Sequence, residues 1–470
     1  MTRNKNRVHF LTFLFFALGL SISGQEGIKL SYENFVGNVL ENNPLAKRAN
    51  NEKRYGDLNN RAARGNYDPY VTGNYANKYL NQTNYYTTLN GEIKQPIFTS
   101  QYLKFGYEYG IGSFVNPELT TATYGLPYLG LEVGVLQGLV IDKRRAEVLK
   151  SREYVNYFDA ENRIQLNSLL FESSQRYFDW LFSAKQVALN NYFMGLARQR
   201  LIAMEALSNI GEKAPIDTVE AAIFFQSRLL DLQNALLDNQ KSLNDISSYN
   251  WQSANVQPIT TLYEPQDSLD TYYTKAKAAL VQKLFQDSVS NPIISKYTSF
   301  QKVLEIENRL KKEMIKPMLN VNYNFLSYNP KDITPAFSNN NYKWGVNLAF
   351  PLFLRNPTNE YKMAKVLSQN NSLELANKSN ELNFKINVLK QTVNILSTQL
   401  QNAERSVSYN RQLVDAEREK FLNGESSLFI LNARENKWLE MELKLAEYKL
   451  KFIKTVINVI YLKGNLNYRL

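Results

Sequence analysis

The clearest residues for chemistry in this chain are two carboxylates, Asp217 and Glu220. They follow Gly211 by six and nine residues in the stretch 209–221, NIGEKAPIDTVEA. Their spacing of three puts both side chains on one face at the start of a helix. Acids at this position can attract cations, or they can simply complement the helix dipole, which is worth about 0.3–1 kcal/mol. The two roles are compatible.

The remaining composition excludes most catalytic chemistry. The chain has no Cys, and its one His is His9, near the N-terminus. Ser-His-Asp and Cys-His nucleophiles and the usual zinc sites are therefore excluded. There is also no G-x-x-x-x-G-K phosphate loop. We predict that the protein is not an enzyme and needs no cofactor.

The first residues are predicted to be a secretory signal peptide, 1–24. Arg3, Lys5 and Arg7 precede the apolar run HFLTFLFFALGL and the small residues SISG, which is the layout of such a peptide. The alternative is an uncleaved anchor. Cleavage would change the formal charge from +11 to +8. Because Lys and Arg are scattered along the chain, we interpret them as solvated helix faces and expect no nucleic-acid binding.

The sequence contains an internal duplication. DPYVTGNY at 68–75 matches KPMLNVNY at 316–323, and alternating apolar residues follow at 129–135 and 342–350. Such alternation predicts half-buried strands or strands of a membrane barrel. Each copy reads as helix, strand, strand, long helix, Gly turn, long helix. The first copy carries an insert at about 81–127, which we expect to be extra extended structure or a long surface loop.

This pattern divides the chain into two repeats, 25–249 and 271–470, joined by a linker at 250–270. Strands are expected at about 68–141 and 317–354. Helical hairpins are expected at about 142–249 and 357–463, with tips near 209–216 and 422–427. Heptads support the hairpins, because Leu431, Trp438, Leu445, Phe452 and Val459 lie seven apart, as do Leu382, Leu389, Leu396 and Ala403. This spacing predicts coiled-coil packing, and helices of this length reach about 90–100 Å.

The ordered set of features resembles the TolC-like outer-membrane efflux and secretion channels. The matching segments are KLSYENFVGNVLENNPLAKRA (29–49), RGNYDPYVTGNY, NLAFPLFLRN (347–356) and the two Gly turns. The resemblance implies a homotrimer whose helical hairpins form a periplasmic α-barrel. A few strands per chain would contribute to a shared β-barrel in outer-membrane lipid. Four or so strands per chain leave open edges, which a bilayer forbids, so oligomerisation is expected on physical grounds as well.

The implied function is a passive exit duct for efflux or type I secretion. It would be driven by an inner-membrane transporter through a periplasmic adaptor. Triplicated Asp217 and Glu220 would form acidic rings at the gate. The second tip has no acid at the matching positions and so departs from the family pattern. Closure there would be apolar or amide-based, with Asn432 as the candidate gate residue. We expect Gly211, Glu212, Gly424 and Glu425 to contact the adaptor.

Two other classes of protein remain open from the sequence. A non-conducting periplasmic or surface coiled-coil protein, structural or adhesive, would share the heptads but would not need the alternating strands. A carboxylate-dependent hydrolase such as a glycosidase needs two converging acids, whereas the acids here lie mostly along helix surfaces. The cargo stays open among drugs, metals and polypeptides.

Overall fold

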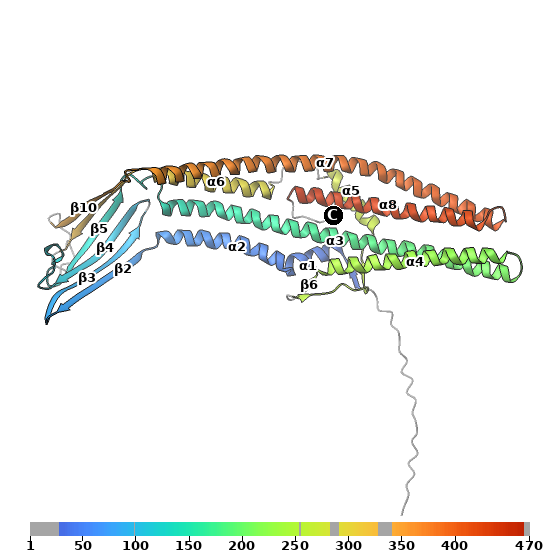
Figure 1. Cartoon of the computed structure of the whole chain (residues 1–470), viewed down its shortest axis with the longest axis horizontal. Coiled ribbons are helices and arrows are strands. Elements are labelled where there is room, and N and C mark those ends of the chain that lie inside the picture. The colour runs from blue at the N-terminus through green and yellow to red at the C-terminus, as the bar shows by residue number, and fades with distance from the viewer. Residues whose placement is uncertain (1–27, 98, 253–254, 283–290, 328–340, 465–470) are drawn as a thin grey trace, which may run out of the picture.

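A computed structural model describes residues 28–97, 99–252, 255–282, 291–327 and 341–464. The predicted signal peptide lies outside these residues. The molecule is long and narrow, with a curled sheet at one end and helices along the rest (Figure 1).

The two halves of the chain repeat one order of elements. The first half consists of α1 (Tyr32–Asn42), α2 (Pro44–Arg64), β2 (Tyr70–Leu80), β3 (Thr83–Pro96), β4 (Gln101–Ile111), β5 (Leu126–Gly134), α3 (Lys143–Asn209) and α4 (Pro215–Ser247). The second half consists of α5 (Leu269–Gln282), α6 (Pro292–Glu313), β9 (Met318–Leu326), β10 (Tyr342–Ala349), α7 (Arg355–Leu422) and α8 (Leu428–Leu462). Short elements complete the described chain: β1 (Ile28–Leu30), β6 (Trp251–Gln252), β7 (Asn255–Val256), β8 (Tyr263–Pro265) and the 3-10 turns Gly65–Tyr67 and Pro117–Leu119.

Helices α2 and α6 begin in the same way. Asn43 and Asn291 each accept a hydrogen bond from the backbone N–H two residues on, and a proline occupies the first helical position. Asparagine is a strong N-cap, and proline fits the first turn because that turn needs no N–H. The same local solution therefore restarts the helix in both halves.

The sheet has six strands in the order β10-β9-β5-β4-β3-β2, and every neighbouring pair is antiparallel. The expectation of four or so strands per chain was wrong, because the insert at 81–127 contributes β3 and β4. The two strands expected as a pair in the first half are not neighbours either. Strand β2 pairs with β3, and β5 pairs with β4 and β9.

The two faces of the sheet differ in polarity. Alternate residues point to opposite faces of a strand, and one face carries exposed apolar side chains on the inner strands as well as on both edge strands. These side chains include Val71, Phe105, Leu131, Trp344 and Leu348. The opposite face is polar. On it the Glu132 carboxylate pairs with the ammonium groups of Lys94 at 2.9 Å and Lys104 at 2.5 Å.

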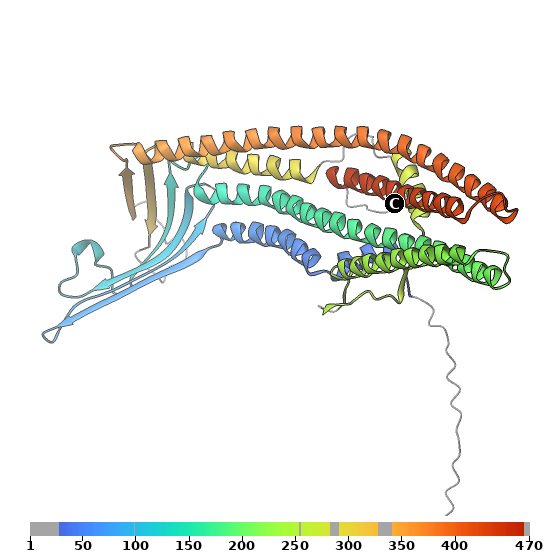
Figure 2. The same cartoon turned by 45° about the vertical axis from the view of Figure 1, so that its right-hand side comes forward.

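The helices form a curved wall four helices wide. Next to the sheet the contacts run α2–α3–α6–α7, and farther away they run α4–α3–α8–α7. Figures 1 and 2 both place α7 along one edge of this wall and α2 with α4 along the other. Helix α3, with 67 residues, spans about 100 Å. Among the described residues, no helix contains an apolar stretch of the length needed to cross a membrane.

The heptad residues form the core of the wall. In α8 all five predicted positions, Leu431 to Val459, are buried. In α7 the row through Leu382, Leu396 and Ala403 is buried, and Leu389 packs against the same core. The seven-residue spacing thus correctly predicts which faces of α7 and α8 are buried.

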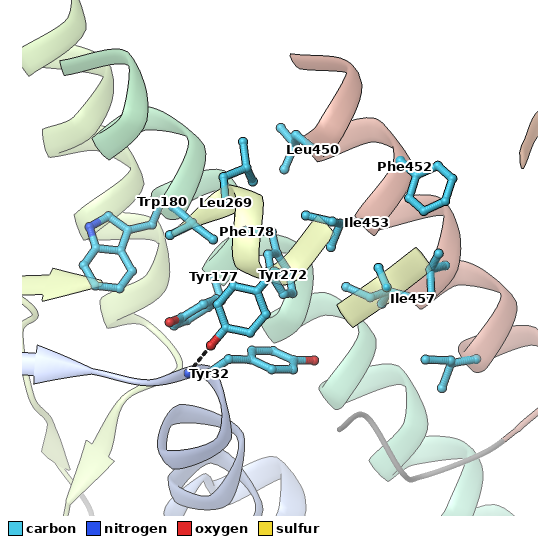
Figure 3. Close-up of a cluster of buried hydrophobic side chains, with 14 of the residues drawn as sticks. Tyr32, Tyr177, Phe178, Trp180, Leu269, Tyr272, Leu450, Phe452, Ile453 and Ile457 are labelled. Atoms are coloured by element: carbon cyan, nitrogen blue, oxygen red, sulfur yellow. Dashed lines mark hydrogen bonds between the residues drawn. The ribbon is translucent and has the colours of Figure 1, made fainter. Parts of the chain in front are cut away.

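An aromatic cluster joins α1, α3 and α5 where the two hairpins meet (Figure 3). Tyr32, Tyr177 and Tyr272 are at most 1% exposed. Each hydroxyl has a partner: Tyr32 bonds Ser174 at 2.7 Å, Tyr177 donates to the Leu30 carbonyl at 3.0 Å, and Tyr272 accepts from the Tyr32 N–H at 3.3 Å. Because burial disfavours the phenolate, it raises the pKa of all three phenols above the ordinary value of 10.0.

This cluster predicts a loss of stability at alkaline pH. In the unfolded chain these tyrosines ionise near pH 10, while in the folded chain they stay neutral, so the free energy of unfolding should fall as pH rises above about 10. Tyr177→Phe should lose about 1 kcal/mol at pH 8, from its hydrogen bond, but should show a shallower alkaline decline. Urea unfolding followed by circular dichroism from pH 8 to 11 measures both. The half-exposed Tyr55 provides the control substitution Tyr55→Phe. Equal alkaline slopes in wild type and Tyr177→Phe would contradict the assignment.

Candidate gate at the hairpin tips

Both hairpin tips turn through one backbone motif. Gly211 and Gly424 adopt φ of 80° and 78°, a left-handed conformation that side-chain-bearing residues rarely adopt. In each tip the following Glu N–H reaches back to close the helix. Glu212 bonds the Leu207 carbonyl at 3.0 Å, and Glu425 bonds the Lys420 carbonyl at 2.8 Å. This is a Schellman closure, and it explains the glycine in both turns, whereas the backbone N–H of any residue except proline could replace that of the glutamate.

The returning helices begin differently in the two tips. Helix α8 is capped by the Ser427 hydroxyl, which accepts from the Ile430 N–H at 3.4 Å. Helix α4 begins with Ala214-Pro215 and has no side-chain cap. Pro215 needs no partner because it has no N–H, and the Asp217 N–H donates to the Ala214 carbonyl at 3.0 Å, so the first turn of α4 starts without a side-chain cap.

The two tips pack against each other. Met204 of α3, Ala221 of α4 and Leu428 of α8 form one buried cluster, and Phe421 of α7 packs against it. The Lys213 ammonium lies 5.4 Å from the centre of the Phe421 ring. One chain therefore presents both tips as a single end.

Asp217 and Glu220 lie at this end, near the start of α4. Both are partly exposed, and in the described part of the chain neither carboxylate makes an ion pair or a side-chain hydrogen bond. The described residues contain no group of three or more acidic or histidine side chains that could hold a metal ion. Within one chain the pair is thus a solvated acidic patch that no local cation neutralises.

Asn432 lies in a different environment. It is 6% exposed, and its amide oxygen accepts a hydrogen bond from the Arg200 guanidinium at 2.6 Å. A buried side chain committed to another helix cannot line a passage, so we leave Asn432 out of the gate. Its burial follows from its place on α8, where Leu428, Asn432, Glu435 and Leu439 are all buried and follow one another at spacings of three or four.

Beside Asn432 the structure places an ionic cluster that the sequence analysis missed. Glu435 of α8 is 1% exposed, and its carboxylate contacts Arg200 of α3 at 2.5 Å and Arg418 of α7 at 3.4 Å. Arg200 belongs to the first hairpin, and Arg418 and Glu435 belong to the second. The cluster therefore ties the two hairpins together just above their tips.

Apolar layers flank this tie on both sides. The Met204 cluster lies toward the tips, and a cluster of Phe193, Val414, Trp438 and Leu439 lies on the other side. A signal for the tie was present in the sequence. Glu435 falls in the apolar three-four pattern of Leu428, Leu431 and Trp438, where a charged residue has to find a buried partner.

Comparison with solved structures identifies the fold. The Campylobacter jejuni outer-membrane channel CmeC matches 92% of this chain and 85% of its own, with a TM-score of 0.61 and 13% identity. The Vibrio cholerae outer-membrane protein VceC matches 92% of this chain and 96% of its own, with a TM-score of 0.62 and 11% identity. The chain has the TolC-like outer-membrane channel fold. The open state of the Neisseria gonorrhoeae MtrE channel shares this fold over 99% of the chain, with a TM-score of 0.60 and 10% identity.

Comparisons of sequence add little to the TolC-like fold. No family model matches the chain. One curated protein, an NAD kinase of Ruminiclostridium cellulolyticum, is 31% identical over 118 residues, which is 24% of this chain. The match spans 39% of that kinase. A partial match of this size carries less weight than a fold shared over nearly the whole chain.

Proposed function

We propose that the protein is the outer-membrane exit duct of a tripartite efflux pump or a type I secretion system. The observation that carries this proposal is the joining of an amphipathic antiparallel sheet to a wall of helices about 100 Å long. A coiled-coil rod would account for the helices alone. It would not account for a sheet that exposes large apolar side chains on one face and charged residues on the other.

The polarity of the sheet supports a wall with lipid outside and water inside. Val71 is 76% exposed, Trp344 63% and Leu348 67%, and such side chains are stable in hydrocarbon. The polar face holds Lys94, Lys104 and Glu132 as mutual partners, as a water-filled interior allows. The predicted signal peptide would deliver the chain to the envelope.

Exposed seams along the wall support a ring of copies. On α4, Ile216, Ile223, Leu230 and Leu237 lie seven apart and are 59–69% exposed. They lie about 200° around the helix from the buried row of Ala221 and Ala235, and thus on the side away from α3. We call these four residues the α4 seam.

The opposite edge of the wall carries a matching row. Val388, Ile395 and Tyr409 of α7 lie on one heptad row and are 43–63% exposed. We call them the α7 seam. Helices α4 and α7 lie at opposite edges of one chain (Figures 1 and 2). Packing the α4 seam of one copy against the α7 seam of the next is a head-to-tail contact, which gives a ring when the rotation between copies closes. We propose a homotrimer, as the TolC-like resemblance implies.

The tips are the proposed docking end for the periplasmic adaptor, which would couple the duct to an inner-membrane transporter. Gly211, Glu212, Gly424 and Glu425 are all exposed. They belong to the α3–α4 and α7–α8 turns, which form the end of the molecule farthest from the sheet (Figure 1). Energy for transport would come from the transporter.

Three copies would place three Asp217–Glu220 pairs around the axis as a cation-attracting ring. Asp217→Asn with Glu220→Gln should shift the reversal potential toward anions, because two formal charges per copy disappear at the narrow end. Reversal potentials in a salt gradient across a planar bilayer measure this. Glu205→Gln, on exposed α3 surface, is the control. Unchanged ion selectivity in the double variant would show that both acids only complement the dipole of α4 and do not line the passage.

The duct itself is tested by isolating the full chain from outer membranes in detergent, then measuring its mass and its conductance in planar bilayers. A trimer that opens ion-conducting pores is the expected result. A protein that fractionates without detergent and never conducts would be the coiled-coil rod instead.

A further inference from the structure

We infer that all six strands of each chain enter the barrel wall, so that three copies close a barrel of 18 strands. The lumen of this barrel would then be about as wide as the helical cylinder below it. This inference rests on the proposed trimeric duct. In this barrel β2 of one copy pairs with β10 of the next. Because the barrel is then wide, the narrow tips limit the size of the cargo.

The first support is that the edge strands carry the same pattern as the centre of the sheet. Val71, Tyr75 and Tyr79 of β2 are 64–76% exposed on the apolar face, and Leu89 and Ile93 follow on β3. The polar face continues too, with Thr72 and Asn74 of β2 opposite Glu92 and Asn90 of β3. A hairpin projecting into water would not need this continuous apolar face. Strands β2 and β3 are therefore built as membrane wall.

The second support is a match of widths. Strands lie about 4.8 Å apart, and barrel strands tilt by about 40°, so six strands cover about 38 Å of circumference. Four packed helices cover about 32–40 Å, and the wall of each copy is four helices wide. Four strands would cover only about 25 Å. Six strands let sheet and helices join without a change of diameter.

The third support is the direction of the two edges. Neighbouring strands alternate in direction across the sheet from β10 to β2. With an even number of strands, β10 and β2 run in opposite directions, so a second copy adds an antiparallel pair. β10 lies on the same edge as α7, and β2 on the same edge as α2 and α4 (Figure 1). A single rotation from one copy to the next can therefore bring the α4 seam against the α7 seam and also β2 against β10.

Side chains on the polar face lie flat against the sheet and leave the interior of the barrel open. Tyr128 lies across Gly106, where an added Cβ would approach its ring to 2.3 Å, and its hydroxyl donates to Glu92 at 2.7 Å. Asn324 lies across Gly130 in the same way. Lys94 and Lys104 turn toward Glu132 on the wall itself. An 18-stranded barrel lined in this manner leaves roughly 25 Å between facing walls, against roughly 14 Å for 12 strands.

Cysteine cross-linking in the full-length protein tests the strand pairing. The sequence contains no Cys, so any disulfide that forms must join the introduced cysteines. Asn347→Cys on the polar face of β10, combined with Thr72→Cys or with Asn74→Cys on the polar face of β2, should give covalent trimers on oxidation in outer membranes. Asn347→Cys with Gly73→Cys is the matched control, because Gly73 lies on the opposite face of β2 and should not cross-link.

A helix-seam pair separates the inference from the proposed function. Leu230→Cys with Tyr409→Cys reports the ring of helices alone. If this pair cross-links while both β2–β10 pairs fail, the trimer stands and the 18-stranded barrel is overturned. If no pair cross-links and the protein does not conduct, the duct itself fails. Electron cryo-microscopy of the wild-type trimer provides the second measurement, with 18 strands expected and 12 contradicting the inference.

Discussion

Aspartate at both Ile223 and Leu230 should convert the trimer into monomers. In the proposed ring the α4 seam packs against α7 of the next copy, so each interface would bury two unpaired carboxylates. Burying one ion without a partner costs several kcal/mol, and the ring contains three such interfaces. Mass measured in detergent by light scattering should fall to that of one chain. Helix content measured by circular dichroism should stay close to that of the wild type, because both side chains are at least 59% exposed in the single chain.

The control adds the same charge beside the seam. Ser227 and Asn234 are exposed on α4 and also lie seven residues apart, about 40–60° around the helix from the seam residues before and after them. Ser227→Asp with Asn234→Asp should leave the trimer intact. Trimers of unchanged stability in the seam variant would show that α4 is not an interface, and the ring would need a different closure.

Glu435→Ala should destabilise the helical wall by about 3–5 kcal/mol. It leaves Arg200, whose side chain is 10% exposed, with a buried charge that no carboxylate balances, and with the Asn432 amide and the Phe224 ring, 5.7 Å away, as remaining contacts. The unfolding midpoint in urea, followed by circular dichroism, measures the loss. Because Glu435 ties the two hairpins, disorder should begin at the tips, and hydrogen exchange should increase first around residues 204–221 and 421–432.

Two variants separate the buried tie from ordinary surface charge. Glu440 pairs with Lys437 where both side chains are more than half exposed, so Glu440→Ala should cost no more than about 1 kcal/mol. Replacing Arg200 and Glu435 together by Leu removes both buried charges, and much of the lost stability should return. If Glu435→Ala lowers the free energy of unfolding no more than Glu440→Ala does, the cluster of Arg200, Arg418 and Glu435 does not stabilise the wall.

The parts of the fold that the sequence predicted are those with a long periodic signal, a glycine that ends one, or a repeated segment. The heptads of α7 and α8 predicted the buried faces because a seven-residue repeat persists over many turns. Gly211 and Gly424 predicted the tips because a positive φ needs glycine. The match between DPYVTGNY and KPMLNVNY placed the first strand of each half, and β2 and β9 lie there.

The features that were missed depend on contacts between distant segments. For the insert at 81–127 the sequence allows extended structure or a surface loop, and β3 and β4 confirm the first. What the sequence does not give is the number of these strands and their neighbours in the sheet. The place of Glu435 in the apolar pattern of α8 calls for a buried partner, but that partner, Arg200, lies on α3 and is brought against it only by the fold. Asn432 was assigned to the gate by its offset from the glycine, and that offset does not say which side of α8 faces α3.

The acid pair, by contrast, lies where the offset predicted, near the start of α4. Its role in selectivity depends on neighbouring copies, so it stays a prediction. The same holds for the adaptor contacts at Gly211, Glu212, Gly424 and Glu425, because a second protein must supply the other half of that interface.

The central claim is that copies of this chain enclose a continuous water-filled passage. Single-channel conductance of the full-length protein, purified from outer membranes and incorporated into planar bilayers, tests it most directly, with the monomeric Ile223→Asp/Leu230→Asp variant as the matched control. The account predicts discrete conductance steps from the trimer and none from the variant. A well-folded trimer that never conducts, or equal conductance from both proteins, would contradict it.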